Sequence, residues 1–131
     1  MDNVEVLKSG YQYFAEGNIE GVLGLFDSKI HWNECIGFPF VVGNGIYTGH
    51  QAIVEGVFGQ IPKHYENFQI EITDLFGSGD KVVMMGHYTG VWKATGKKFK
   101  ANATHVWTMK DGKATHFFQA VDTAEIINAS A

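Results

Sequence analysis

The segment KFKANATHVWTMKDGKATHFFQAV, residues 98–121, sets the architecture expected for this chain. Polar and apolar side chains alternate from Lys98 to Met109, a pattern that is typical of a half-buried strand. The residues Lys110-Asp111-Gly112-Lys113 then form a turn, and a second strand runs from Ala114 to Val121. The segment therefore predicts an antiparallel hairpin with the odd-numbered side chains of its first strand in the core.

The same pattern extends towards the N-terminus. Residues 68–73 alternate cleanly, residues 77–80 turn the chain into a strand over 81–93, and residues 94–97 turn it into the hairpin. The even-numbered side chains of 81–93 are the more apolar, so they are expected to face inward. In the last strand Phe117 and Gln119 alternate with His116 and Phe118, and periodicity alone leaves its inward face open.

Three helices are expected before this meander, each preceded by a capping side chain. They span residues 3–16, capped by Asp2 or Asn3; residues 19–26, capped by Asn18; and residues 50–60, capped by Thr48. A strand over 30–34 follows the second helix, and residues 36–49 read as an irregular, glycine-rich loop. We therefore expect one α+β domain, residues 1–131, with a curved mixed sheet packed against three helices.

The composition is that of an ordinary globular domain: 131 residues, 45% apolar, 18% charged, with a net charge of −4. No basic stripe indicates nucleic acid, and no apolar run approaches the roughly 20 residues that span a bilayer. The single cysteine, Cys35, excludes an intramolecular disulfide, and the N-terminus lacks the layout of a signal peptide, so a cytoplasmic location is expected. Scattered histidines and the lack of a phosphate-binding glycine loop predict no metal and no nucleotide cofactor.

Glu34 is the most unusual residue of the expected strand over 30–34. It shares the apolar face with Ile30 and Trp32, because side chains alternate with a period of two along a strand. A carboxyl group on the core side must be paired, protonated or exposed to a cavity, and the last two conditions suit a general acid or base. The structural alternatives are a carboxylate that reaches solvent at the strand end, or one tied to His105.

Two further polar side chains are expected on inward faces: His105 in the strand 98–109 and Tyr88 in the strand 81–93. An acid, an imidazole and a phenol in an aromatic cavity can form a proton-transfer site. The structural alternative is that they are hydrogen-bonded core residues. The side chains expected to contact a ligand are Trp32, Trp107, Phe38, Met84 and His50, the last at a helix start near the cavity mouth.

Two segments carry a resemblance to the nuclear transport factor 2-like superfamily: YQYFAEGNIEGVLGLFDSKIHW, residues 11–32, and HVWTMKDGKATHFFQAVDTAEI, residues 105–126. Within that superfamily the chain is similar to SnoaL-like polyketide cyclases and ketosteroid isomerase-related proteins. The resemblance implies the cone-shaped, cystatin-like form of the α+β fold. It says less about chemistry, because one scaffold hosts isomerases, cyclases, hydrolases and non-catalytic binding modules.

By this resemblance Glu34 occupies the position of the proton-shuttling carboxylate of the isomerases. The position of their oxyanion-hole tyrosine is Gly10, with Tyr11 on a different face of the helix, and His105 replaces their second carboxyl group. Both changes argue against steroid isomerisation. Limonene epoxide hydrolase-like relatives carry one catalytic carboxylate at the position of Gln119 and another at that of Tyr88, so the resemblance implies that the paired acids of those enzymes are missing here. By the same resemblance Gln119 faces inward, where its amide is expected to contact a ligand.

The resulting expectation is a cofactor-independent isomerase or cyclase that transfers a proton on a small, apolar carbonyl compound. Glu34 would move the proton, while His105 and Tyr88 would donate hydrogen bonds to the enolate oxygen. The alternative is a non-catalytic module that binds a small ligand or a protein. The resemblance also implies a homodimer formed through the outer sheet face, with Val106, His116 and Phe118 as candidate contacts.

Overall fold

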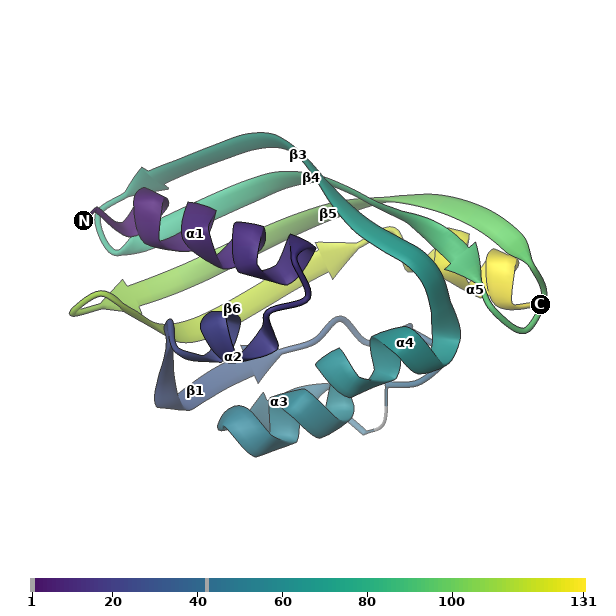
Figure 1. The fold of residues 1–131 in the computed structure, drawn as a ribbon, viewed down its shortest axis with the longest axis horizontal. Coiled ribbons are helices and arrows are strands. Elements are labelled where there is room, and N and C mark those ends of the chain that lie inside the picture. Colours follow the sequence, from purple (N-terminus) through teal and green to yellow (C-terminus); the bar gives the residue numbers. More distant parts are fainter. Residues whose placement is uncertain (1, 42) are drawn as a thin grey trace.

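The computed structural model describes residues 2–41 and 43–131, and a six-stranded sheet is its frame (Figure 1). The strand order is β2-β1-β6-β5-β4-β3, with β1 parallel to β6 and every other neighbouring pair antiparallel. The bounds are β1 Phe26–Asn33, β2 Ile46–Thr48, β3 Tyr65–Ser78, β4 Lys81–Trp92, β5 Lys97–Lys110 and β6 Lys113–Val121. The α+β class, the mixed sheet and the predicted meander are confirmed.

Helices cover one side of this curved sheet and one of its ends (Figure 1). Their bounds are α1 Asn3–Ala15, α2 Ile19–Leu23, α3 His50–Gly56, the 3-10 helix η1 Phe58–Gln60, α4 Ile61–His64 and α5 Thr123–Ser130. Asp2 is the N-cap of α1, because its carboxylate accepts the Glu5 N–H at 2.9 Å. Within residues 2–41 and 43–131, no helix combines the length and hydropathy needed to cross a bilayer.

The second helix is shorter than expected, because Phe26 begins β1 and does not end α2. Its side chain is buried and packs against the rings of Trp32 and Trp107, with ring centroids 5.7 and 5.5 Å away. An apolar run of this kind fits the end of a helix or the start of a buried strand. Burial of Phe26 against the other aromatic rings therefore favours the start of β1 over the end of α2.

The loop predicted over 36–49 contains a short strand. β2 pairs antiparallel with the end of β1, and Thr48 belongs to it. Gly49, which has no side chain to cap with, therefore precedes α3. The third predicted helix is also broken: α3 ends at Gly56, and α4 restarts with Pro62 in its first turn, where the missing proline N–H costs no hydrogen bond.

The inward faces follow the predicted alternation. Even-numbered side chains of β4 and odd-numbered side chains of β5 are the buried ones. On β6 the buried residues include Phe117 and Gln119, which settles the face that periodicity left open.

Two apolar clusters fill the interior. One gathers around Ile30 and Ile53 next to α1, α2 and α3, and the other around Tyr65 and Ile126 near α5. His105 packs against both clusters. Its ring centroid lies 4.9 Å from that of Phe117 in the first cluster and 5.8 Å from that of Tyr88 in the second. The buried polar residues therefore lie where the two clusters meet.

Candidate active site

Glu34 directly follows the last residue of β1, Asn33, and so lies one residue beyond the strand that was predicted to include it. Its side chain is 4% exposed, and its N–H donates to the Gly45 carbonyl at 2.8 Å. Gly45 has a φ of 75°, and a Cβ there would lie 2.6 Å from the Glu34 carbonyl oxygen, so this position requires glycine. This hydrogen bond joins the glycine-rich loop to the end of β1 and holds the backbone of Glu34 in place.

Three N–H donors reach the buried Glu34 carboxyl group. Trp32 Nε1 donates to Oε1 at 3.4 Å, Gln119 Nε2 donates to the same oxygen, and the Cys35 N–H adds a backbone bond. Burial raises the pKa of Glu34 to about 7, because desolvation outweighs the lowering effect of the Trp32 and Cys35 donors. Glu34 therefore changes its protonation state near neutral pH, as a general base requires.

His105, 3% exposed, lies at the centre of a buried hydrogen-bond chain. Its Nδ1 is 2.7 Å from the Tyr11 hydroxyl, which in turn accepts the Trp107 Nε1–H at 2.8 Å. Its Nε2 is 2.5 Å from the Tyr88 hydroxyl. Both ring nitrogens therefore have partners inside the protein.

The chain continues from Tyr88 to Glu34 through an amide. The Tyr88 hydroxyl donates to Gln119 Oε1 at 2.5 Å, and Gln119 Nε2 donates to Glu34 Oε1. Since the register of β5 and β6 places His105 opposite Gln119, the pairing of these strands brings the imidazole and the amide together. Six side chains from four strands or their ends and one helix thus form one connected path from Trp107 to the Glu34 carboxyl group.

The donor and the acceptor of each hydrogen bond between Gln119 and Tyr11 follow from the amide oxygen of Gln119. Gln119 Oε1 carries no hydrogen, so Tyr88 donates to it and offers only a lone pair to His105. His105 therefore carries its ring proton on Nε2, and Nδ1 accepts the Tyr11 O–H. The imidazole is neutral, because burial lowers the pKa of His105 to about 3.

The shifted pKa values of Glu34 and His105 act on stability in opposite directions. Folded Glu34 keeps a proton that the unfolded chain releases, so its contribution falls as the pH rises from about 4.5 to about 7. Folded His105 lacks a proton that the unfolded chain takes up, so its contribution is lost as the pH falls from about 6.5 to about 3. Between about pH 4.5 and 6.5, where the two pH ranges overlap, the opposite effects on the free energy of unfolding cancel.

A cavity between sheet and helices adjoins this path, with Glu34, His105 and Gln119 in its otherwise aromatic and aliphatic wall. Its volume is about 80 Å³. An apolar cavity of about 150 Å³ accepts benzene, so a ring compound enters this one only when side chains of its wall move apart.

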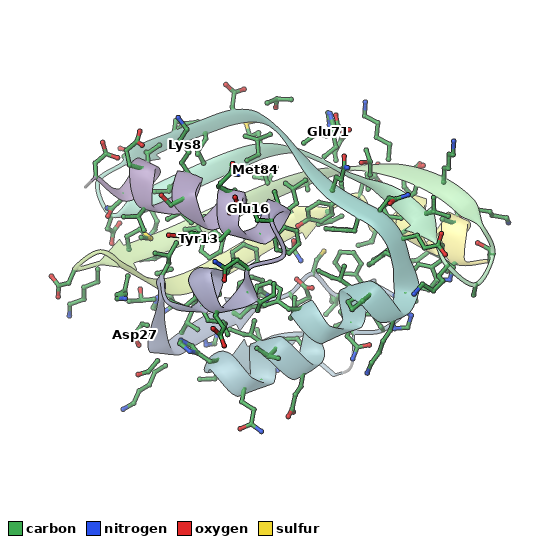
Figure 2. All side chains as sticks on the ribbon, viewed as in Figure 1. Lys8, Tyr13, Glu16, Asp27, Glu71 and Met84 are labelled. Carbon is green, nitrogen blue, oxygen red and sulfur yellow. The ribbon has the colours of Figure 1, made fainter. Side chains whose placement is uncertain are left out.

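Most of the residues predicted to contact a ligand do line the cavity: Trp32, Trp107, Gln119 and Phe38, besides Glu34, His105 and Tyr88. Met84 does not line the cavity; it is fully buried on β4, in the region behind α1 (Figure 2). His50 does not line it either. Its Nε2 lies 3.1 Å from the Phe26 carbonyl, so it joins the start of α3 to β1.

Two tyrosines of the site were missed by the sequence reasoning. Tyr11 was placed on another face of its helix, yet its hydroxyl reaches His105 and Trp107. Tyr65, the first residue of β3, lines the cavity and was not singled out at all. The only available signal for Tyr11 was its place in the apolar spacing of the first helix. Across residues 2–41 and 43–131, no group of three or more His, Cys, Asp or Glu side chains is placed to hold a metal ion.

A sequence profile of the SnoaL-like domain matches residues 8–117, most of the chain. The chain belongs to the SnoaL-like family. Among curated proteins, none matches it.

Solved structures of SnoaL-like and NTF2-like proteins share the fold. An NTF2-like protein from Burkholderia thailandensis is 27% identical, with a TM-score of 0.93, and the match covers 100% of this chain and 98% of that one. TerC, co-crystallised with polyporic acid, is 26% identical, with a TM-score of 0.86 and coverage of 98% and 97%. A protein with a ketosteroid isomerase-like fold from Catenulispora acidiphila, in complex with trimethylamine, is 17% identical, with a TM-score of 0.79 and coverage of 96% and 92%. At that identity it supports the fold alone.

Proposed function

We propose that this SnoaL-like protein is a cofactor-independent enzyme that moves a proton next to the carbonyl group of a small, largely apolar compound. The observation that carries the proposal is the buried Glu34 carboxyl group in the wall of an aromatic cavity. Its pKa of about 7 suits a base that must first accept and then return a proton. The co-crystal of TerC with polyporic acid supports a small-molecule ligand.

In the proposed step, Glu34 takes a proton from the carbon next to the carbonyl group. The C–H electron pair moves into the new double bond, and the carbonyl oxygen gains the negative charge. In a substrate with a C=C bond between its β and γ carbons the product is a dienolate, and the Glu34 carboxylic acid then returns the proton to the γ carbon, which completes an isomerisation without a cofactor. Trp32 and Gln119 both donate to Oε1, so Oε2 is the oxygen assigned to the transferred proton.

His105 and Tyr88 take a positioning role in this proposal. The hydrogens on Nε2 and on the phenol are already donated inside the protein, so neither is free for an enolate oxygen. They orient the Gln119 amide, which orients Glu34. This replaces the direct donation that the sequence suggested.

Proton exchange on a carbonyl probe tests the proposal. 2-Tetralone is a two-ring ketone with acidic α hydrogens, and its apolar frame matches the largely apolar wall of the cavity. We expect the protein to accelerate its exchange in deuterium oxide above the buffer rate, and Glu34→Gln to lower that acceleration by about a hundredfold or more. Glu20→Gln on the exposed side of α2 is the matched control.

Exchange at the buffer rate with the unmodified protein, or full exchange with Glu34→Gln, would contradict the enzyme proposal. Binding of 2-tetralone without exchange would favour the alternative, a non-catalytic module that binds a small ligand.

We also propose that the protein is a homodimer joined through its outer sheet face. The strand register aligns Phe76, Val83, Val106 and Phe118 in one row across β3, β4, β5 and β6. Phe76 and Phe118 are each 50% exposed, and a continuous apolar row on a sheet face supports association with another protein surface. A cytoplasmic location, and the absence of nucleic-acid and membrane partners, remain predictions from the sequence.

A further inference from the structure

The Tyr65 hydroxyl is a buried polar group with no use in the path described above. Tyr65 is 4% exposed, and among the described residues its hydroxyl is the buried side-chain polar atom without a hydrogen-bond partner. A buried hydroxyl that lacks a partner is costly, and native proteins nearly always provide one. The missing partner is therefore expected to come from a molecule in the cavity that Tyr65 lines.

The Tyr65 ring is held by neighbouring aromatic rings. The centroids of Phe68, Phe99, Trp92 and Phe40 lie 5.0, 5.3, 5.4 and 5.9 Å from it. These contacts restrict rotation of the ring, so the hydroxyl cannot swing away to find an acceptor elsewhere. A fixed donor in an apolar wall is the usual means of orienting a small ligand.

The charge state of Tyr65 suits a donor. Burial, and in addition the negative charge of Glu34, raise the pKa of Tyr65 well above its usual range. The hydroxyl therefore keeps its hydrogen at all physiological pH values. Tyr65 and Glu34 line the same cavity.

We propose that the Tyr65 hydroxyl holds the oxygen of a ligand carbonyl group, with the adjacent C–H bond turned towards Glu34. The carbonyl itself rests on the proposed function, whereas the need for an oxygen acceptor rests on the unpartnered hydroxyl alone. When Glu34 takes the proton, the electron pair of the broken C–H bond moves towards the oxygen that Tyr65 holds. Tyr65 keeps its own proton and stabilises the charge by hydrogen bonding.

The comparison of two probes of one shape tests the inference. 2-Tetralone and tetralin have the same two-ring frame, and only 2-tetralone carries an oxygen. We expect Tyr65→Phe to weaken binding of 2-tetralone by about three- to tenfold, the worth of one hydrogen bond, and to leave binding of tetralin unchanged. Tyr13→Phe is the control, since Tyr13 packs between α1 and α2 and does not line the cavity (Figure 2).

A urea unfolding curve shows whether Tyr65→Phe folds. The substitution removes an unpaired buried hydroxyl, so the midpoint is expected to stay or to rise. Equal weakening of both probes, no weakening of 2-tetralone, or no binding of 2-tetralone up to its solubility limit would overturn the inference. Failure of Glu34→Gln to stop exchange would overturn the proposed function and leave the binding result for Tyr65 intact.

Discussion

Tyr88→Phe and Tyr65→Phe remove the same atom from two tyrosines in one cavity, and we expect opposite effects on stability. Tyr88 is 6% exposed and Tyr65 is 4% exposed, so the apolar area that each ring buries is similar. The Tyr88 hydroxyl has two hydrogen-bond partners, whereas that of Tyr65 has none among the described residues. Comparing the two variants therefore separates the contribution of the hydrogen-bond chain to the free energy of unfolding from the contribution of ring packing.

The cost of Tyr88→Phe follows from the groups that lose a partner. His105 Nε2–H loses its acceptor, and Gln119 Oε1 loses its donor, while both side chains remain at most 5% exposed. Each unsatisfied buried group costs about 1 to 3 kcal/mol, so the free energy of unfolding should fall by about 2 to 5 kcal/mol. That is about a third of the stability of a typical domain.

Urea unfolding at pH 8 measures the difference, followed by both fluorescence and circular dichroism. Tyr88→Phe should lower the midpoint by about 1 to 2 M at an unchanged slope, while Tyr65→Phe should leave it in place or raise it. A loss below about 0.5 kcal/mol for Tyr88→Phe, or an equal loss for both variants, would refute the assigned chain of hydrogen bonds.

Two further predictions concern pH and assembly. Glu34→Gln removes the group that destabilises the fold between pH 4.5 and 7, so its stability relative to the unmodified protein should rise by about 3 kcal/mol across that range; parallel curves of unfolding free energy against pH would contradict the raised pKa. Phe118→Lys places a charge in the apolar row of the outer sheet face and should convert a dimer into monomers in sedimentation velocity. Ile127→Lys is the control, because it places the same charge at an exposed apolar residue of α5, outside the sheet. A monomeric unmodified protein at micromolar concentration would rule out the proposed dimer.

Much of this site was predictable because strand alternation is a local property. Successive side chains of a strand point to opposite faces whatever the rest of the chain does, so Glu34, Tyr88 and His105 could be placed inward from spacing alone. The turns after β3, β4 and β5 were equally predictable, because each contains glycine together with other residues that favour turns. Where spacing was ambiguous, as on β6, the resemblance placed Gln119 correctly.

Contacts between distant elements could not be predicted in the same way. Phe26 suits a helix end and a buried strand equally, and only its aromatic neighbours place it in β1. Tyr11 reaches His105 because α1 packs across the sheet at one particular rotation, which helical spacing does not fix to within one residue. The break between α3 and α4 likewise depends on how that segment fits against β1 and β3.

Residue types and their period along the chain were enough to establish an α+β sheet with an acid, an imidazole and a phenol on its inner face. They could not show which of those groups keeps a donor hydrogen without a partner inside the protein. That depends on the partner of each donor in three dimensions: His105 and Tyr88 donate within the protein, and the Tyr65 hydroxyl does not. Hydrogen bonding is directional and short-ranged, so packing of the whole chain, and not the order of its residues, decides which donor faces the cavity.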